Sequence, residues 1–182
     1  MEFSHYSVML EECIAGLAIR PDGIYVDGTA GGAGHSCQIA KRLTDGKLFA
    51  LDKDPDAVNI AEQRLAPYAQ ATVIQADFRD LCCTLKERGI TGVDGILLDL
   101  GVSSYQLDTA ERGFSYHQDA PLDMRMSKTG PSAQDLVNTY STEDLSRIIR
   151  EFGEEKYAWS IAKNIEKARA KAPITTDRKS VV

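Results

Sequence analysis

The chain has 182 residues, enough for one domain with a sizeable core and part of a second. Its 43% hydrophobic and 26% charged residues are typical of a folded protein and exclude a fibrous or disordered chain. No apolar run approaches membrane-spanning length, and the apolar stretch 8–19 is interrupted by Glu11 and Glu12 and lacks a basic leader. We therefore expect neither a membrane anchor nor a signal peptide.

Charge is divided unevenly along the chain. Residues 1–146 hold twelve basic residues against twenty-two acids, and residues 147–182 hold nine against five, so the net charges are −10 and +4 and sum to −6. The acidic body excludes indiscriminate nucleic-acid binding, which needs a basic footprint. The basic C-terminal part leaves a local RNA contact open, although a solvated helix face explains its charges equally well.

The cysteines form no C-x-x-C pair: they are Cys13, Cys37, Cys82 and Cys83. We expect reduced thiols in a cytoplasmic protein, without a metal site.

The first elements predicted along the chain are a helix over 7–18 and a buried strand that begins at Ile24. Residues 24–36, Ile-Tyr-Val-Asp-Gly-Thr-Ala-Gly-Gly-Ala-Gly-His-Ser, run from this strand into a glycine loop and then a helix to Leu43 that Ser36 is expected to cap. Glycines let a backbone approach a ligand closely, so the loop predicts a binding site. A purely structural turn is the alternative.

Asp27 narrows the kind of ligand. It stands before the glycines, where a carboxylate would repel phosphate and suits a cation such as the sulfonium and ammonium of S-adenosylmethionine. Cys37 occupies the place of the third glycine in a dinucleotide fingerprint. Both features disfavour a nicotinamide-dependent oxidoreductase.

The next two strands also end in polar residues. The strand 47–51 leads to Asp52, where a carboxylate can accept hydrogen bonds from both ribose hydroxyls. A helix-capping role is the alternative for Asp52, but Asp54 fills it better at the start of a helix to about Leu65. The third strand, 72–75, is followed by Asp77-Phe78. These two residues suit the amino group and ring of adenine, or else only cap and pack.

A helix over 81–88 leads to a fourth strand, 95–98, which ends at Asp99. Four strand and helix units with a functional loop after each strand predict an α/β fold, in which ligands bind at the carboxyl ends of a parallel sheet. The order of acids and glycines is that of a Rossmann-like class I S-adenosylmethionine-dependent methyltransferase. Only four strands are recognisable. Three helical segments, 132–140, 141–153 and 154–170, then predict the start of a helical insertion subdomain.

Five motifs carry a resemblance to a known family: His5-Tyr-Ser-Val-Met-Leu10, Asp27-Gly-Thr-Ala-Gly-Gly-Ala-Gly-His-Ser36, Gly95-Ile-Leu-Leu-Asp-Leu-Gly-Val-Ser-Ser104, Glu111-Arg-Gly-Phe-Ser115 and Pro121-Leu-Asp-Met-Arg-Met126. Over residues 3 to about 176 the chain closely resembles the ribosomal RNA small subunit methyltransferase H family, also called MraW. The resemblance implies S-adenosylmethionine-dependent methylation of N4 of a cytidine in the decoding region of 16S ribosomal RNA. The implied partner is that RNA or the 30S subunit, with no membrane or metal; the oligomeric state stays open.

Carried over position by position, the family's cofactor contacts fall on seven residues: Ala33, Gly34, His35, Asp52, Phe78, Asp99 and Gln106. His35 and Gln106 come from the resemblance, and a histidine that opens a helix more often caps or packs. Ala33 replaces a glycine often found in the family.

The implied chemistry needs hydrogen-bond acceptors, because the lone pair of the cytosine amino group is delocalised into the ring. Asp99 and Asp123 are the candidate catalytic acceptors. Asp99-Leu-Gly-Val departs from the Asp/Asn-Pro-Pro-aromatic loop of DNA amino-methyltransferases, which disfavours a DNA-adenine substrate. Arg112 and Arg125 are the candidate phosphate contacts. Pairing of Arg125 with Asp123 is the alternative.

In the last predicted helix the apolar residues Tyr157, Ile161, Ile165 and Ala168 recur at helical spacing and predict a packing face. The exposed basic residues would be Lys163, Lys167, Arg169 and Lys171. They are candidates for contact with RNA backbone.

The predicted layout is a cofactor-binding half over 1–104, a loop and helical insertion subdomain over 105–176, and a non-native tail over 177–182. The last six residues, Asp-Arg-Lys-Ser-Val-Val, match one translated frame of a common sequencing adapter, so we expect a longer natural enzyme. A non-catalytic RNA-binding or ribosome-assembly module with the same fold is the alternative function.

Overall fold

The computed structural model describes residues 7–117 and 119–176. The chain divides into two compact units, the first up to Gly101 and the second from Val102, and each is taken by itself. The start of the motif at His5 and the predicted tail 177–182 lie outside the described residues. Within the described ranges no helix is both long enough and apolar enough to cross a lipid bilayer.

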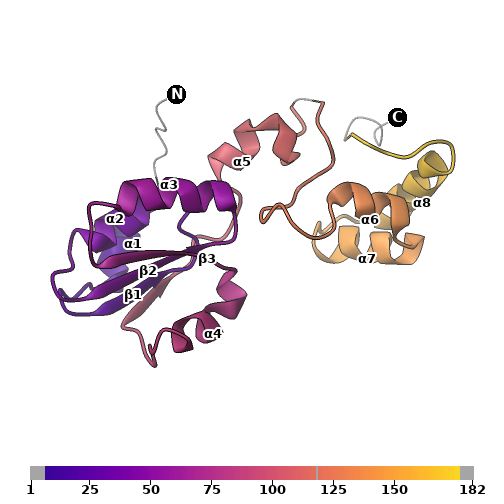
Figure 1. The fold of residues 1–182 in the computed structure, drawn as a ribbon. Helices are drawn as coiled ribbons and strands as arrows, with labels where there is room; N and C mark the ends of the chain where they lie inside the picture. The colour runs from indigo at the N-terminus through magenta and orange to yellow at the C-terminus, as the bar shows by residue number, and fades with distance from the viewer. Residues whose placement is uncertain (1–6, 118, 177–182) are drawn as a thin grey trace. The chain divides into compact units, whose positions relative to one another are not determined.

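The first unit is built on a four-stranded, fully parallel sheet with the order β3-β2-β1-β4 (Figure 1). The strands are β1 Ile24–Asp27, β2 Lys47–Asp52, β3 Ala71–Gln75 and β4 Gly95–Leu97. Asp27 pairs in register with Ala50 on one side and Leu97 on the other, so the carboxyl ends of these strands lie side by side. The parallel sheet with helices between its strands confirms the predicted α/β fold.

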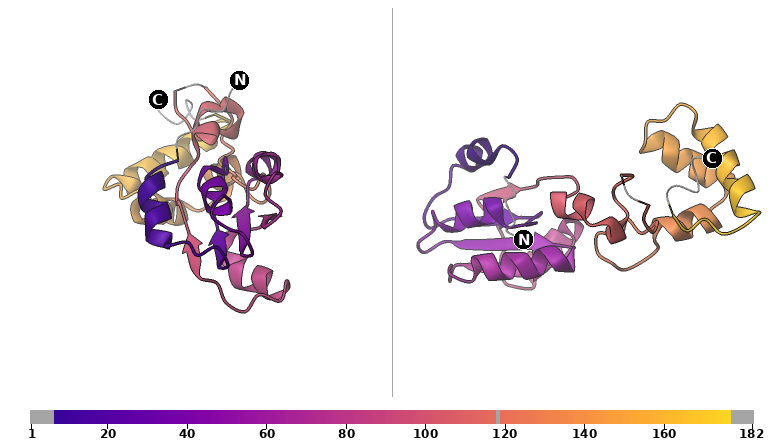
Figure 2. Two further views of the ribbon diagram at one scale, coloured as in Figure 1. Left: turned by 90° about the vertical axis from the view of Figure 1, so that its left-hand side faces the viewer. Right: turned by 90° about the horizontal axis from the view of Figure 1, so that it is seen from above.

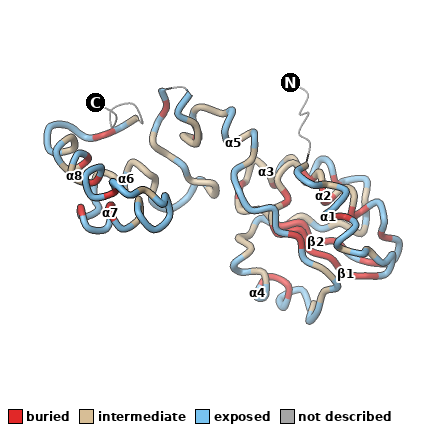
Figure 3. The backbone as a smooth tube through the Cα atoms, turned by 180° about the vertical axis from the view of Figure 1, so that it is seen from behind, coloured by how far each residue is buried: buried red, intermediate tan, exposed pale blue. Residues whose placement is uncertain are grey.

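Helices cover both faces of this sheet, as Figures 1 and 2 show. They are α1 Leu10–Leu17, α2 Gly34–Ala40, α3 Pro55–Leu65, the 3-10 turn η1 Phe78–Asp80 and α4 Leu81–Lys86. Side chains alternate along a strand, so Leu48 of β2 packs with α1, α2 and α3, whereas its neighbour Phe49 packs toward α4. The two central strands, β1 and β2, are the most continuously buried part of the unit (Figure 3).

The second unit begins with α5 Ser104–Asp108 and the 3-10 turn η2 Ala110–Arg112 and continues with α6 Ala133–Thr139, α7 Thr142–Glu151 and α8 Ala158–Arg169. Ser132 and Ser141 cap α6 and α7 by accepting the backbone N–H three residues on. A small core of Leu145, Ala162 and Ile165 joins α7 to α8. Three helices follow the loop region, as predicted.

Two local predictions are wrong. Ser36 does not cap α2, which starts at Gly34 with Ala33 as its N-cap residue. The packing face predicted for the last helix is wrong at Tyr157 and Ile161, which are 65% and 38% exposed. It is confirmed at Ile165 and Ala168, which pack into the core of this unit together with Ala158 and Ala162. The small residues Ala158 and Ala162 let α8 pack closely against α7. This packing fixes how α8 is rotated about its own axis, which the positions of the larger apolar side chains do not reveal.

Candidate functional site

Four loops meet at the carboxyl ends of the parallel strands, and backbone hydrogen bonds tie them together. Gly28 N–H donates to the Leu97 carbonyl at 2.9 Å, and Ala30 N–H donates to the Leu51 carbonyl at 2.8 Å. The Thr29 hydroxyl accepts from the Asp99 N–H at 2.7 Å. The loop after β1 is therefore joined to the ends of both neighbouring strands, β2 and β4.

Asp27 lies beneath the loops at the carboxyl ends of the strands. Its carboxylate is 1% exposed, accepts a 2.6 Å hydrogen bond from the Ser36 hydroxyl and accepts the Thr29 N–H at 3.2 Å. Burial raises the pKa of the Asp27 carboxyl, and the hydrogen bond from Ser36 opposes part of that rise. The expectation that Asp27 faces a cationic ligand is corrected, because its carboxylate instead joins β1 to α2.

Asp52 holds the glycine loop at the end of β2. Its Oδ2 accepts the Gly31 N–H at 2.8 Å, and its Oδ1 accepts the Asp54 N–H at 2.9 Å. Burial raises the pKa of the Asp52 carboxyl, while the backbone hydrogen bonds from Asp54 and Gly31 lower it. Each carboxylate oxygen keeps a second lone pair, so Asp52 can still accept from a ligand diol. Asp54 caps α3, as predicted.

The glycine loop makes a left-handed turn before α2. Gly31 has φ 49° and Ala33 has φ 58°, and Ala33 is fully buried. This conformation costs a residue with a Cβ about 1 to 2 kcal/mol, whereas glycine adopts it freely. Ala33 therefore stands where glycine fits the backbone better.

Gly34 and His35 contact the segment that precedes α1. A Cβ on Gly34 would overlap the Ser7 hydroxyl, which would then have to rotate away. The His35 ring is 5% exposed, with its Nε2 3.1 Å from the Val8 carbonyl. Both residues thus hold the N-terminal segment over the start of α2.

Asp77 and Phe78, in the loop after β3, make different contacts. Asp77 accepts the Arg79 N–H and pairs with its guanidinium at 2.8 Å, and Arg79 lowers the pKa of the Asp77 carboxyl. Phe78 is half-buried and lies against Gly28, where an added Cβ would come within 3.3 Å of the Phe78 Cβ. Phe78 therefore reaches the end of β1 from the end of β3.

Asp99 presents its side chain at the end of β4. It is exposed, and its carboxylate makes no hydrogen bond or ion pair within residues 7–117 and 119–176. Its backbone is held by the hydrogen bond to Thr29. This carboxylate is positioned by the sheet and can bind a ligand.

The candidate residues of the second unit are held in its loops. Gln106 is 6% exposed and closes a capping box with Ser103, whose N–H donates to the Gln106 side chain at 3.0 Å. Arg112 is also 6% exposed, and its Nη2 donates to the carbonyls of Arg125 and Met126 at 3.1 and 3.0 Å. Arg112 therefore shapes the loop that carries Arg125.

Asp123 and Arg125 form a close ion pair. Arg125 Nη2 lies 2.6 Å from Asp123 Oδ2, and the Arg125 Nε donates to Oδ1 at 3.0 Å. The Arg125 guanidinium lowers the pKa of the Asp123 carboxyl. The pairing that the sequence analysis left open is present.

Thr29 and Ser36 organise this site through their hydrogen bonds to Asp99 and Asp27. The motif predicted no role for Thr29 and only a helix cap for Ser36. Thr29 follows Asp27 by two residues, which is the spacing of a local turn and was an available signal. Ser36 follows it by nine, across a loop, and no sequence period links the two.

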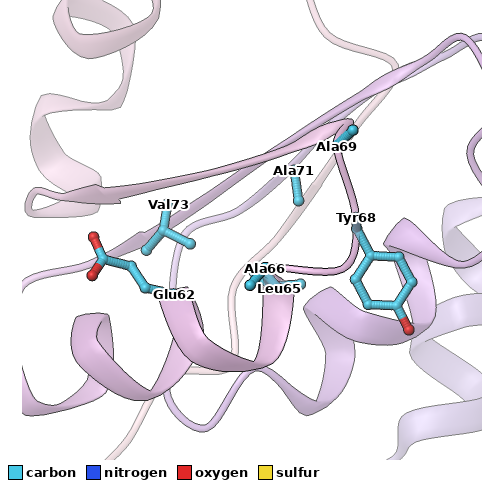
Figure 4. A pocket seen from close by; sticks show the side chains of 7 residues that line it. All are labelled: Glu62, Leu65, Ala66, Tyr68, Ala69, Ala71 and Val73. Atoms are coloured by element: carbon cyan, nitrogen blue, oxygen red, sulfur yellow. The ribbon is translucent and has the colours of Figure 1, made fainter.

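A hollow of about 300 Å³ lies between α3 and β3 (Figure 4). It is lined by Glu62, Leu65, Ala66, Tyr68, Ala69, Ala71 and Val73. It adjoins the loop that enters β3, at the amino end of the strand, so it does not belong to the site at the carboxyl ends. Among the described residues, no three His, Cys, Asp or Glu side chains gather as a metal site would need.

Comparison with known proteins gives a family match along nearly the whole chain. The model of the MraW methylase family matches residues 2–181. The ribosomal RNA small subunit methyltransferase H 2 of Agathobacter rectalis is 57% identical over 180 residues, covering 97% of this chain and 57% of that protein. The ribosomal RNA small subunit methyltransferase H of Lachnospira eligens is 56% identical over 179 residues, with the same two coverages of 97% and 57%.

The chain thus spans 57% of the length of these curated relatives. Among solved structures, a SAM dependent methyltransferase from Aquifex aeolicus matches with a TM-score of 0.40 and 16% identity, covering 80% of this chain and 79% of that one. That likeness is too weak to carry an argument about function.

Proposed function

Because the chain belongs to the MraW methylase family, we propose that it acts in S-adenosylmethionine-dependent methylation of N4 of a cytidine in the decoding region of 16S ribosomal RNA. The names of its curated relatives support ribosomal RNA of the small subunit as the substrate. The partner would then be that RNA or the 30S subunit, in the cytoplasm.

The observation that carries the proposal is the order of side chains along one edge of the sheet. Phe78 follows β3, Asp52 ends β2, the glycine loop follows β1 and Asp99 follows β4, and these four strands are neighbours in that order. An adenine, a ribose and a charged sulfur succeed each other in the same order along S-adenosylmethionine.

The residues present fit this cofactor. Asp52 offers spare lone pairs to a diol and Phe78 offers a ring to a base. Asp99 offers a carboxylate that has no partner among the described residues, either to the cationic cofactor or to the amino group of the base. Ala33, Gly34, His35 and Gln106 complete the proposed cofactor set. When bound, S-adenosylmethionine supplies a methyl group on a positively charged sulfur.

Asp99 is the better candidate for the cytosine amino group. An acceptor on an amino hydrogen localises the nitrogen lone pair and aims it. The Asp123 carboxylate is already bound by Arg125, whereas the Asp99 carboxylate has no such partner among the described residues. We assign to Asp99 the orientation of N4 and the uptake of the proton that N4 loses, and to Asp123 a supporting role.

Arg125 is the better candidate for a phosphate contact. Its side chain is 32% exposed, whereas Arg112 is buried under the loop. The Arg125 guanidinium is bound by Asp123 and donates to the Gly130 carbonyl at 3.2 Å, so it would have to exchange Asp123 for the phosphate. Arg112 would act through the loop that it supports.

The cofactor proposal is tested by calorimetric titration of S-adenosylmethionine into the 182-residue protein. Asp52→Asn should weaken binding at least about tenfold, because it removes a charged acceptor. Asp45→Asn, at an exposed turn, is the matched control and should leave affinity unchanged. No saturable binding by the folded wild-type protein would contradict the proposal.

The reaction is tested with reconstituted small subunits that carry unmethylated 16S ribosomal RNA and with isotope-labelled methyl donor. Mass spectrometry of the digested RNA should find the label in N4-methylcytidine, and Asp99→Ala should abolish it while retaining the bound RNA. Binding of donor and RNA without transfer would favour the non-catalytic assembly module instead.

A further inference from the structure

One face of α8 carries a row of basic side chains around a tryptophan. The row, called here the α8 basic face, consists of Lys156, Trp159, Lys163, Lys167 and Lys171. Spacings of four residues place Trp159, Lys163 and Lys167 on one side of α8, whose other side packs into the core through Ala158 and Ala162. Lys156 lies in the turn before α8 and Lys171 in the turn after it, so they extend the row beyond the helix. Residues 156–171 hold five basic residues against one acid.

Trp159 is the only tryptophan of the chain and is 46% exposed. The Nζ of Lys163 lies 5.3 Å from its ring centroid, within the range of a cation–π contact. Large aromatic rings dominate interfaces, so a half-exposed tryptophan beside a cation is suited to stacking on a partner.

The lysines of this face are largely uncompensated. Lys163 pairs with Glu166 at 2.9 Å, but Lys167 and Lys171 form no ion pair with any residue that the structure describes. Arg169 points elsewhere and donates to the Val137 carbonyl at 2.9 Å. The face therefore presents net positive charge in a chain whose overall charge is −6.

We propose that the α8 basic face docks an unpaired stretch of RNA, with Trp159 stacked on a base and the lysines against phosphates. Stacking on an aromatic ring within a basic groove is the usual way in which proteins hold single strands. Lysine is depleted from protein interfaces, so this composition favours RNA over a protein partner. The inference rests on the proposed function only in that the RNA is ribosomal, and it uses no residue of the proposed cofactor or catalytic set.

The single tryptophan makes the contact directly measurable. A single-stranded fragment of 16S ribosomal RNA, labelled with a dye, is titrated while its anisotropy and the Trp159 emission are followed. Saturable quenching of Trp159 should accompany the rise in anisotropy. Trp159→Ala should weaken binding roughly tenfold, Trp159→Phe should restore most of it, and Phe152→Ala, which removes an aromatic ring 77% exposed outside α8, should have no effect.

The lysines are tested by the salt dependence of the same binding. Replacing Lys167 and Lys171 together by glutamine should lower the slope of log K against log salt by about 0.7 for each phosphate that the protein no longer neutralises. Lys86→Gln in α4 is the control and should leave the slope unchanged.

The outcomes separate this inference from the proposed function. RNA binding with unchanged Trp159 emission, or with equal affinity for Trp159→Ala, would overturn the α8 docking surface alone. A Trp159-dependent self-association without RNA quenching would overturn it in favour of a protein contact. Absence of any RNA binding by the folded protein would overturn the ribosomal RNA substrate and this inference together.

Discussion

The hydroxyl of Ser36, in the first turn of α2, lies 2.6 Å from the Oδ2 of Asp27 at the end of β1, and neither residue is more than 1% exposed. A buried carboxylate is costly unless donors surround it. This contact therefore fixes the start of α2 against the sheet, and with it the loop that ends at Gly34.

Ser36→Ala should destabilise the protein by about 1 to 3 kcal/mol, because it leaves a buried acceptor without its donor. Ser160→Ala, at an exposed position of α8, is the matched control and should change stability little. Urea unfolding followed by circular dichroism measures both. Equal midpoints for the two variants would contradict the assigned role of Ser36.

The stability of the protein should depend on pH in the acid range because of Asp27. Burial raises its folded pKa above the usual 3.8, so the folded state binds the proton more tightly than the unfolded chain. The unfolding free energy due to this group is therefore highest below the unfolded pKa and falls as pH rises through the folded pKa, by about 1.4 kcal/mol for each pKa unit of difference.

Asp27→Asn should remove this fall, because an amide does not titrate, and the Ser36 hydroxyl can rotate to meet the amide. The difference in unfolding free energy between wild type and Asp27→Asn, measured across the acid range, isolates the group from other carboxyls. A difference that does not change with pH would show that Asp27 is not buried as an acid. Asp45→Asn, at an exposed turn, serves as the control.

Gly34→Ala should destabilise the N-terminal segment, because the new Cβ would overlap the Ser7 hydroxyl. Ser7→Ala removes that hydroxyl, so the double variant should recover part of the loss. A double-mutant cycle on unfolding free energies gives the coupling, expected at about 0.5 to 3 kcal/mol. Additive effects would mean that Ser7 does not lie over Gly34 in solution.

The contribution of the Asp123–Arg125 pair to stability should change with pH in the opposite direction to that of Asp27. Arg125 lowers the folded pKa of Asp123, so the stabilisation is present above the unfolded pKa and is lost as pH falls through the folded one. Both side chains are partly exposed, so solvent screens the pair; the coupling is expected to be small and to weaken in salt.

A double-mutant cycle with Asp123→Asn and Arg125→Gln, at neutral and acid pH, measures this coupling. The coupling should vanish once Asp123 is protonated. Persistence of the full coupling in acid would indicate that the charge of Asp123 does not contribute.

The positions of Asp52, Phe78 and Asp99 follow from local pattern. Each stands at the end of an apolar run, and consecutive parallel strands joined by helices bring their carboxyl ends to one edge. The four strands, the order of the helices and the cap at Asp54 could be predicted for the same reason. Hydrophobic periodicity and turn residues are local signals that extend over only a few positions, so they can be recognised in the sequence without knowledge of the tertiary structure.

The burial of Asp27 and its contact with Ser36 depend on how closely α2 approaches β1, which no residue spacing encodes. The exposure of Tyr157, against expectation, follows from the rotation of α8, which the small residues facing α7 settle. Contacts between segments depend on packing of the whole core, where shape and volume outweigh local preference. Sequence pattern therefore located the strand ends of the candidate site, and packing in three dimensions decided which of their side chains are exposed at that edge and which hold the fold.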